Sequence, residues 1–145
     1  MDANISPKVV RALSALFPAH EFCSVGTGKA DSDAPWISEF ASAGGDGFIG
    51  LDKQIHNRPH EVKALQESGL NSCLFEFGKL VGLSPQAAVL VYAWPKIANA
   101  WQEARGGLVL RLRPTLNLNS MRLEQLEFWI DNGQPRLRKY SVHKP

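Results

Sequence analysis

Apolar residues in the first two thirds of the chain fall into short groups that alternate between helical and extended spacing. Val10, Leu13 and Phe17 follow Ser6-Pro7 at helical spacing, and a hydroxyl residue before proline is typical of a helix start. The same pattern predicts further helices from about residues 33, 57 and 84, and strands at 21–25, 47–51 and 71–77. Helices and strands in alternation predict a parallel sheet with helices on both faces.

The pattern changes after residue 107. Residues 108–112 alternate as a strand does, and Asp131-Asn132-Gly133 is a typical hairpin turn. The segment before that turn, 123–130, fits either a strand or a helix. Pro95 is expected to interrupt the fourth helix, with 96–104 continuing at a new angle. We expect an α/β fold with a mostly parallel sheet in residues 1–104, and a C-terminal β-rich extension, 105–145, packed on the same domain.

Composition narrows the class of protein. A chain of 145 residues with 44% hydrophobic content fits one globular domain. No apolar run approaches the roughly 20 residues that a membrane span needs, and the N-terminus lacks a signal-peptide pattern. The two cysteines, Cys23 and Cys73, lie in apolar stretches and are expected to be reduced and buried. We therefore expect a cytoplasmic protein without membrane contact.

Charge is unevenly distributed along the chain. Residues 1–104 hold 8 Lys+Arg against 11 Asp+Glu, net −3, whereas residues 105–145 hold 8 against 3, net +5. An acidic body with a basic C-terminal part is typical of a metal site beside a nucleic-acid-binding surface. On this interpretation Arg136, Arg138 and Lys139 contact phosphate; the alternative is a solvated basic edge.

Three aspartates, Asp2, Asp33 and Asp52, lie at predicted breaks between elements. The carboxyl ends of parallel strands share one edge of a sheet, and ligands bind there. Three carboxylates gathered at that edge would repel each other unless a cation lay between them. Hard ions such as Mg²⁺ prefer a few carboxylates together with water and substrate phosphate. The pattern therefore predicts metal-assisted cleavage of a phosphodiester, without a covalent nucleophile.

Each aspartate also has a structural alternative. Asp2 could be an ordinary terminal residue, and Asp33 could cap the helix that follows it. Asp31 competes with Asp33 for the site role, and Asp52 also suits a turn after a strand.

Three residues near the aspartates in the sequence are further candidates for the same site. Asn4 either orients Asp2 or makes a local turn, and Glu61 is either a fourth acid or a carboxylate favoured in the first turn of a helix. Lys53 either contacts phosphate or is solvated.

Four motifs in series resemble those of PIN-like nuclease domains, over residues 2 to about 102. Each motif is weak alone, and their order and spacing make the resemblance specific. They are Asp2-Ala3-Asn4-Ile5-Ser6-Pro7, Asp33-Ala34-Pro35-Trp36-Ile37, Gly50-Leu51-Asp52-Lys53-Gln54-Ile55, and Arg58-Pro59 with Glu61 and Ala64-Leu65.

The resemblance implies a three-layer α/β/α sandwich, Mg²⁺ or Mn²⁺ held by Asp2, Asp33 and Asp52, and endoribonuclease activity on RNA. Such domains often act as the toxin of a VapC-type toxin–antitoxin pair. They usually carry an apolar strand before the first aspartate, whereas only Met1 precedes Asp2 here. We expect either an upstream start or a substitute strand. A catalytically inactive PIN-like binding module is the alternative.

The basic C-terminal segment also carries apolar side chains between residues 126 and 130. A short two-stranded unit cannot bury such a set alone. Either a partner covers them, an antitoxin or a second copy in a homodimer, or they fold onto the core of the same domain.

Overall fold

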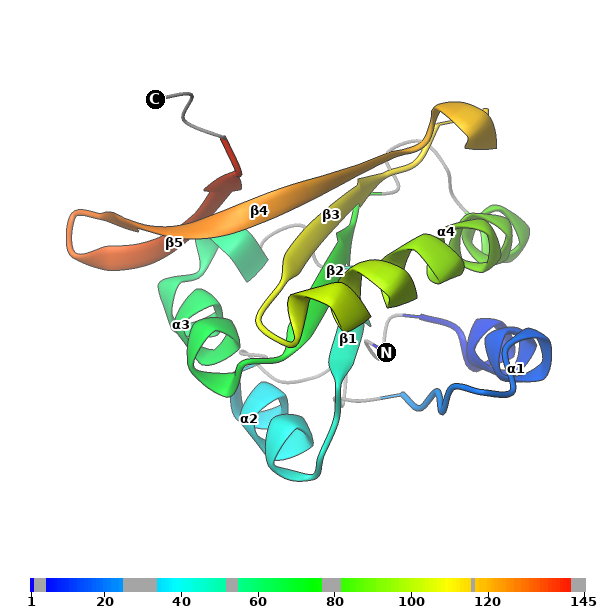
Figure 1. The fold of residues 1–145 in the computed structure, drawn as a ribbon, viewed down its shortest axis with the longest axis horizontal. Coiled ribbons are helices and arrows are strands. Elements are labelled where there is room, and N and C mark those ends of the chain that lie inside the picture. Colours follow the sequence, from blue (N-terminus) through cyan, green and yellow to red (C-terminus); the bar gives the residue numbers. More distant parts are fainter. Residues whose placement is uncertain (2–4, 25–33, 52–54, 77–81, 116, 142–145) are drawn as a thin grey trace.

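The computed structural model describes residues 1, 5–24, 34–51, 55–76, 82–115 and 117–141, which form an α/β fold (Figure 1). This class was predicted from the sequence. The helices are α1 Pro7–Leu16, α2 Ala34–Ser42, η1 Ile55–Asn57, α3 Pro59–Ser68, α4 Leu83–Ala104 and η2 Leu118–Ser120. The strands are β1 Gly47–Gly50, β2 Asn71–Phe75, β3 Val109–Arg113, β4 Arg122–Asp131 and β5 Gln134–Lys139.

The strands form one mixed sheet in the order β1-β2-β3-β4-β5. The first three strands are parallel, with α3 and α4 as the connections between them. β4 and β5 are antiparallel to their neighbours. The C-terminal segment therefore contributes β3 to the middle of the sheet as well as the β4–β5 hairpin, and a domain boundary at residue 104 remains a prediction.

Alternate side chains of the parallel strands enter two separate hydrophobic clusters. Ile49, Cys73 and Leu110 pack with α1 and α4, whereas their neighbours Phe48, Leu74 and Val109 pack with α2 and α3. Figure 1 shows α1 with α4 on one side of the sheet and α2 with α3 on the other. Burial on both faces explains why these strands are short apolar runs without a polar alternation.

The helix starts follow the sequence signals. The Ser6 hydroxyl accepts a hydrogen bond from the Lys8 N–H at 3.3 Å, and Pro7 occupies the first turn of α1. α3 begins at Pro59 and ends before Gly69, which is left-handed at φ 68°. Both helices therefore begin close to where the sequence predicted.

The predicted strand at 21–25 is wrong for residues 21–24, which are in no strand; residue 25 lies outside the described part. Within the described residues no strand pairs with this segment, and the Cys23 carbonyl accepts a hydrogen bond from the Met1 amino group rather than from a neighbouring strand. Cys23 is consequently exposed, contrary to expectation, while Cys73 is buried. Burial raises the pKa of the Cys73 thiol far above its usual range, so this cysteine is protonated and unreactive.

Pro95 does not interrupt the fourth helix, because α4 continues from Leu83 to Ala104. Proline removes one backbone hydrogen bond from the helix interior. Trp94 before it, and Ile97 and Ala98 after it, are all buried in the same cluster. Packing on both sides of the proline therefore holds the two halves together as one helix.

The hairpin turn is as predicted. Asn132 and Gly133 both have positive φ, 48° and 76°, as a two-residue type I′ turn requires. The ambiguous segment before it is therefore strand β4. Leu126 is buried and Phe128 packs against the α2/α3 cluster, so part of the apolar set folds onto the domain's own core.

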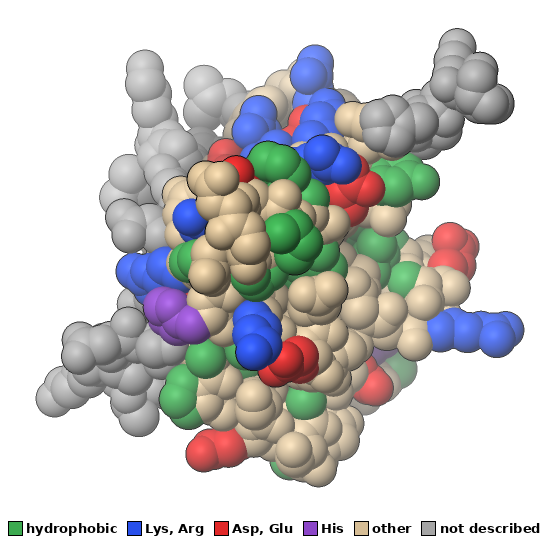
Figure 2. Space-filling model, turned by 90° about the vertical axis from the view of Figure 1, so that its left-hand side faces the viewer, with side chains coloured by type: hydrophobic (Ala, Val, Ile, Leu, Met, Phe, Trp, Pro, Cys, Tyr) green, Lys and Arg blue, Asp and Glu red, His purple; other side chains and the backbone are tan. Residues whose placement is uncertain are grey.

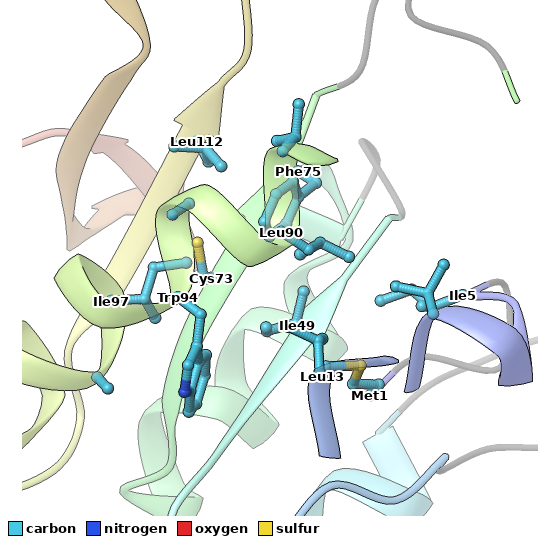
Figure 3. Packing of buried hydrophobic residues seen from close by; sticks show 14 of the residues in the cluster. Met1, Ile5, Leu13, Ile49, Cys73, Phe75, Leu90, Trp94, Ile97 and Leu112 are labelled. Atoms are coloured by element: carbon cyan, nitrogen blue, oxygen red, sulfur yellow. The ribbon is translucent and has the colours of Figure 1, made fainter. Parts of the chain in front are cut away.

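Ile49→Ala should destabilise the protein by about 2–5 kcal/mol, because Ile49 is 2% exposed and its removal leaves a cavity beside α1 (Figure 3). The matched control is Ile130→Ala in β4, where the side chain is 62% exposed and the change should stay within about 0.5 kcal/mol. Urea denaturation followed by circular dichroism measures both. Equal effects would contradict the placement of β1 in the core.

Candidate functional site

The three predicted metal-binding aspartates, Asp2, Asp33 and Asp52, lie outside the described residues, as do Asn4 and Lys53. Their convergence at one edge of the sheet therefore remains a prediction. The residues that border them are described and show how each acidic motif is anchored.

The first and third acidic motifs border the same hydrophobic cluster. Met1 and Ile5, on either side of the first motif's acid, are buried with α1 and α4 (Figure 3). Leu51, directly before Asp52, follows the carboxyl end of β1 and packs against this cluster too. The Met1 amino group donates a hydrogen bond to the Cys23 carbonyl at 2.5 Å.

The second and third motifs border the other cluster. Ala34, directly after Asp33, packs against the α2/α3 cluster, and Ile55, three residues after Asp52, is buried within it. The third motif thus has described neighbours in both clusters, one on each face of the sheet.

Glu61 is fully buried in the first turn of α3. Arg58 Nη1 donates to its Oε1 at 3.1 Å, and His60 Nε2 lies 3.8 Å from the same oxygen. An arginine partner and the positive end of the helix dipole both favour a carboxylate here. These contacts account for Glu61 as a structural residue, and its role as a fourth acid remains a prediction.

The predicted phosphate-contacting residues of the C-terminal segment all lie on β5 and have different partners. Arg136 Nη1 donates to the carbonyl oxygen of Asn57 in η1, so β5 is tied to the segment that follows the third acidic motif. Arg138 Nε donates to Glu127 at 2.9 Å, and Lys139 Nζ to Glu124 at 3.2 Å. Their role in binding RNA is still a prediction.

An ion-pair network that the sequence did not predict lies at the carboxyl ends of β2 and β3. Arg111 donates to Glu124 Oε2 from Nε at 3.1 Å and from Nη2 at 2.7 Å, and Arg113 Nε lies 3.4 Å from Glu76. Arg111 and Glu124 are only 16% and 11% exposed. The network requires Arg111 to lie opposite Glu124, and the sequence gives no signal for that register.

The pKa of Glu124 is lowered from its usual value, chiefly because Arg111 donates hydrogen bonds to it, with a further contribution from Lys139. Charge-assisted hydrogen bonds stabilise the ionised form. Glu124 is therefore ionised in the native structure.

Within the described residues no group of three or more His, Cys, Asp and Glu side chains is placed to hold a metal ion. The three aspartates, which lie outside the described residues, remain the predicted metal ligands. Carboxylate oxygens are the donors that hard divalent ions prefer, so the chemistry of this set fits Mg²⁺ or Mn²⁺.

An open pocket of about 790 Å³ lies at the other end of the parallel strands. Its lining includes Asp46 before β1, Asn71 at the start of β2 and Arg105 before β3. Trp94 and Trp101, whose rings meet edge to face with centroids 5.6 Å apart, line it from α4. This pocket is therefore separate from the edge where Asp52 follows β1.

Among the described helices, none combines the length and the apolar character that crossing a membrane requires.

Comparison with known families gives one finding. A family model described as a PIN-like domain matches residues 1–76, which include all three acidic motifs and extend just past β2. Comparisons with curated proteins and with solved structures give no significant match.

Glu124→Gln should destabilise the protein at pH 7 and have little effect in acid. The pKa of Glu124 is lower in the folded state than the value of about 4.3 in the unfolded chain. Its ionised form therefore adds stability above the unfolded pKa, and this contribution is lost as the pH falls through the folded pKa. Urea denaturation of both proteins from pH 3 to pH 8 measures the difference.

The control for this experiment is Glu103→Gln, because Glu103 is exposed at the end of α4. If the difference in the free energy of unfolding between wild type and Glu124→Gln does not change with pH, the charge of Glu124 contributes nothing to stability.

Proposed function

The chain belongs to the PIN-like domain family, and on that premise we propose that it is a divalent-metal-dependent endoribonuclease. We propose further that the sheet and its two pairs of helices form the three-layer α/β/α sandwich of this family. The observation that carries the proposal is the family match itself, because it covers all three acidic motifs and because PIN-like domains are generally nucleases.

The described neighbours of the aspartates support a common site. Asp2, Asp33 and Asp52 are covalently bonded to Met1, Ala34 and Leu51, and these three residues pack in or against the two clusters that share β1. Asp52 comes two residues after the carboxyl end of β1, at the edge where ligands of open α/β sheets bind. Each motif thus has a described neighbour in or against a cluster to which β1 contributes a side chain.

The proposed site assigns a task to each residue. Asp2, Asp33 and Asp52 would hold Mg²⁺ or Mn²⁺, which when bound supplies a more acidic water and neutralises charge on the phosphate. Asn4 would orient Asp2, and Glu61, held by Arg58, would act as the fourth acid beside the third motif.

Basic residues would position the RNA backbone by electrostatic attraction. Lys53 directly follows Asp52 in the chain, and Arg136 is fixed to Asn57 five residues after Asp52. Arg138 and Lys139 would add positive charge on opposite faces of β5. Figure 2, which views the molecule from the hairpin side, shows Lys and Arg side chains interspersed with acidic ones. Contacts of this kind weaken strongly as salt is added.

Asp52→Asn should abolish cleavage of a labelled RNA, because the change keeps the shape of the side chain but removes the charge that holds the ion. The loss should exceed the roughly 10- to 100-fold that removing an outer-shell partner of a metal ligand costs. The matched control is Asp46→Asn, because Asp46 is exposed and lies before β1, at the opposite end of the strand.

Activity is measured with Mg²⁺, with Mn²⁺ and with EDTA. Cleavage that persists in EDTA, or in Asp52→Asn, would refute the metal mechanism. A folded wild-type chain that binds RNA and never cleaves it would favour an inactive PIN-like binding module instead.

We also propose an antitoxin-like protein partner and self-association of the chain. An unregulated ribonuclease would be harmful to the cell that makes it. Trp129 and Ile130 remain exposed on the hairpin, whereas Leu126 and Phe128 pack on the domain's own core. A partner surface would therefore be smaller than the sequence suggested.

Induced expression of the wild-type chain should arrest bacterial growth, whereas Asp52→Asn, expressed to the same level, should be tolerated. Growth curves and quantitative blots measure this, and light scattering of the Asp52→Asn protein measures self-association. A wild-type chain that is tolerated at high expression and is monomeric would contradict both parts of the proposal.

A further inference from the structure

The β4–β5 hairpin has one buried and one open face. Leu126 and Leu137 are buried on one face against the α2/α3 cluster. The register pairs Trp129 with Arg136 and Glu127 with Arg138, and alternation along the strands places these four side chains on the opposite face. In Figure 1, α1 and α4 lie beside β1–β3 and do not reach the tip of the hairpin.

This open face carries two exposed aromatic rings. Trp129 is 36% exposed and Tyr140 is 43% exposed. The Tyr140 N–H donates to the Gln125 carbonyl at 2.9 Å, so Tyr140 continues the ladder on the same face as Trp129. Tyr140 lies opposite Gln125, which is four residues from Trp129 and therefore about 13 Å away along β4. The two aromatic residues thus occupy separate positions on the same face.

Arg138 lies between these aromatic residues and is shared by two partners. Its guanidinium is 5.2 Å from the centre of the Trp129 ring, and its Nε donates to Glu127 at 2.9 Å. The Trp129 ring and the Arg138 guanidinium therefore lie together, and about half of the Arg138 side chain remains exposed.

We propose that this open face binds single-stranded RNA, with bases stacked on Trp129 and Tyr140 and phosphate near Arg138. Aromatic side chains beside basic ones are the common means of binding single strands with little sequence preference. Among the four side chains that the register places on this face, Arg136 and Arg138 are cations and Glu127 is the one anion, and this excess of positive charge beside aromatic rings favours a polyanion as the occupant over a protein. Paired bases in a duplex cannot stack on a protein ring, so the face selects unpaired RNA.

The proposal rests on the proposed ribonuclease function and specifies the form of its substrate. Arg136 is on the same face as Trp129 and is fixed to Asn57, which follows the third acidic motif. A strand bound across the hairpin would thus lead toward the segment that contains Asp52.

The ion pair between Glu127 and Arg138 leads to a testable prediction. Because Glu127 holds Arg138, a phosphate must compete with a carboxylate for the same guanidinium. Glu127→Gln removes that competing charge and should strengthen RNA binding. Loss of a merely structural ion pair would leave the affinity unchanged or weaken it, so the sign of the effect is informative.

The experiment measures binding of the full chain to a fluorescent oligouridylate by anisotropy, in EDTA so that cleavage plays no part. Trp129→Ala should weaken binding about 5- to 150-fold, the range expected for the loss of one stacked base. Glu127→Gln should tighten binding and steepen its salt dependence. Ile130→Ala is the matched control, because Ile130 is exposed on the opposite face of the same hairpin. A duplex of equal length should bind more weakly than the single strand.

Unchanged affinity of Trp129→Ala, or equal affinity for duplex and single strand, would overturn the proposal. If Trp129→Ala instead disrupts self-association and leaves RNA binding intact, the face is a protein interface. Should this variant fail to fold, RNA-dependent quenching of wild-type tryptophan fluorescence replaces it, because Trp129 is the exposed one of the four tryptophans, whereas Trp36 is half-buried and Trp94 and Trp101 are buried. No quenching would again overturn the proposal.

Failure of this inference is distinguishable from failure of the proposed function. If the chain cleaves RNA but its RNA affinity does not depend on Trp129, only the proposed role of the open face is wrong. If the chain binds RNA through Trp129 but does not cleave it, only the proposed ribonuclease function is wrong.

Discussion

Burial of β2 on both faces is the constraint on which the rest of the structure depends. Every residue from Asn71 to Phe75 is buried, and β2 pairs in parallel with β1 on one side and β3 on the other. Parallel pairing requires crossover connections, which α3 and α4 supply, and each crossover covers a different face of the sheet. The carboxyl ends of three strands are thereby brought to one edge, and the third acidic motif begins at Gly50, the last residue of β1.

The neighbouring ends of β2 and β3 show how this edge tolerates charge. Arg111 alternates with apolar residues in β3 and lies at the place where parallel pairing gives way to antiparallel pairing with β4. A largely buried arginine loses hydration, which costs more than the ion pair returns unless its hydrogen bonds are well placed. The two short bonds to Glu124, with Glu76 nearby, meet that condition and fix the register of β4. Register in turn decides which residues of the hairpin face the core.

Local signals in the sequence predicted the elements well, and long-range contacts account for what it missed. Ser6-Pro7 and Asp131-Asn132-Gly133 act within a few residues, so α1 and the hairpin turn were predictable. Pro95 was misjudged because buried neighbours on both sides outweigh one lost hydrogen bond. Residues 21–24 have strand-like composition, but composition does not decide whether a segment pairs with a neighbour, and within the described residues β1 pairs only with β2. The acidic motifs were readable as a series, whereas the ion-pair network and the open face of the hairpin depend on pairings that no local pattern encodes.

The placement of charge on the hairpin also bears on how a nuclease of this kind would work. Tight binding of RNA through the hairpin alone would stabilise substrate and transition state equally, and would not speed the chemical step. Glu127 would limit such binding, because it occupies part of the guanidinium that a phosphate would contact. Arg136, in contrast, is tied to Asn57 in the segment after the third acidic motif. If the proposed function is right, a weak stacking surface tied to that segment would align the strand and still allow the product to leave, and the aromatic residues and the acids would then belong to one substrate path.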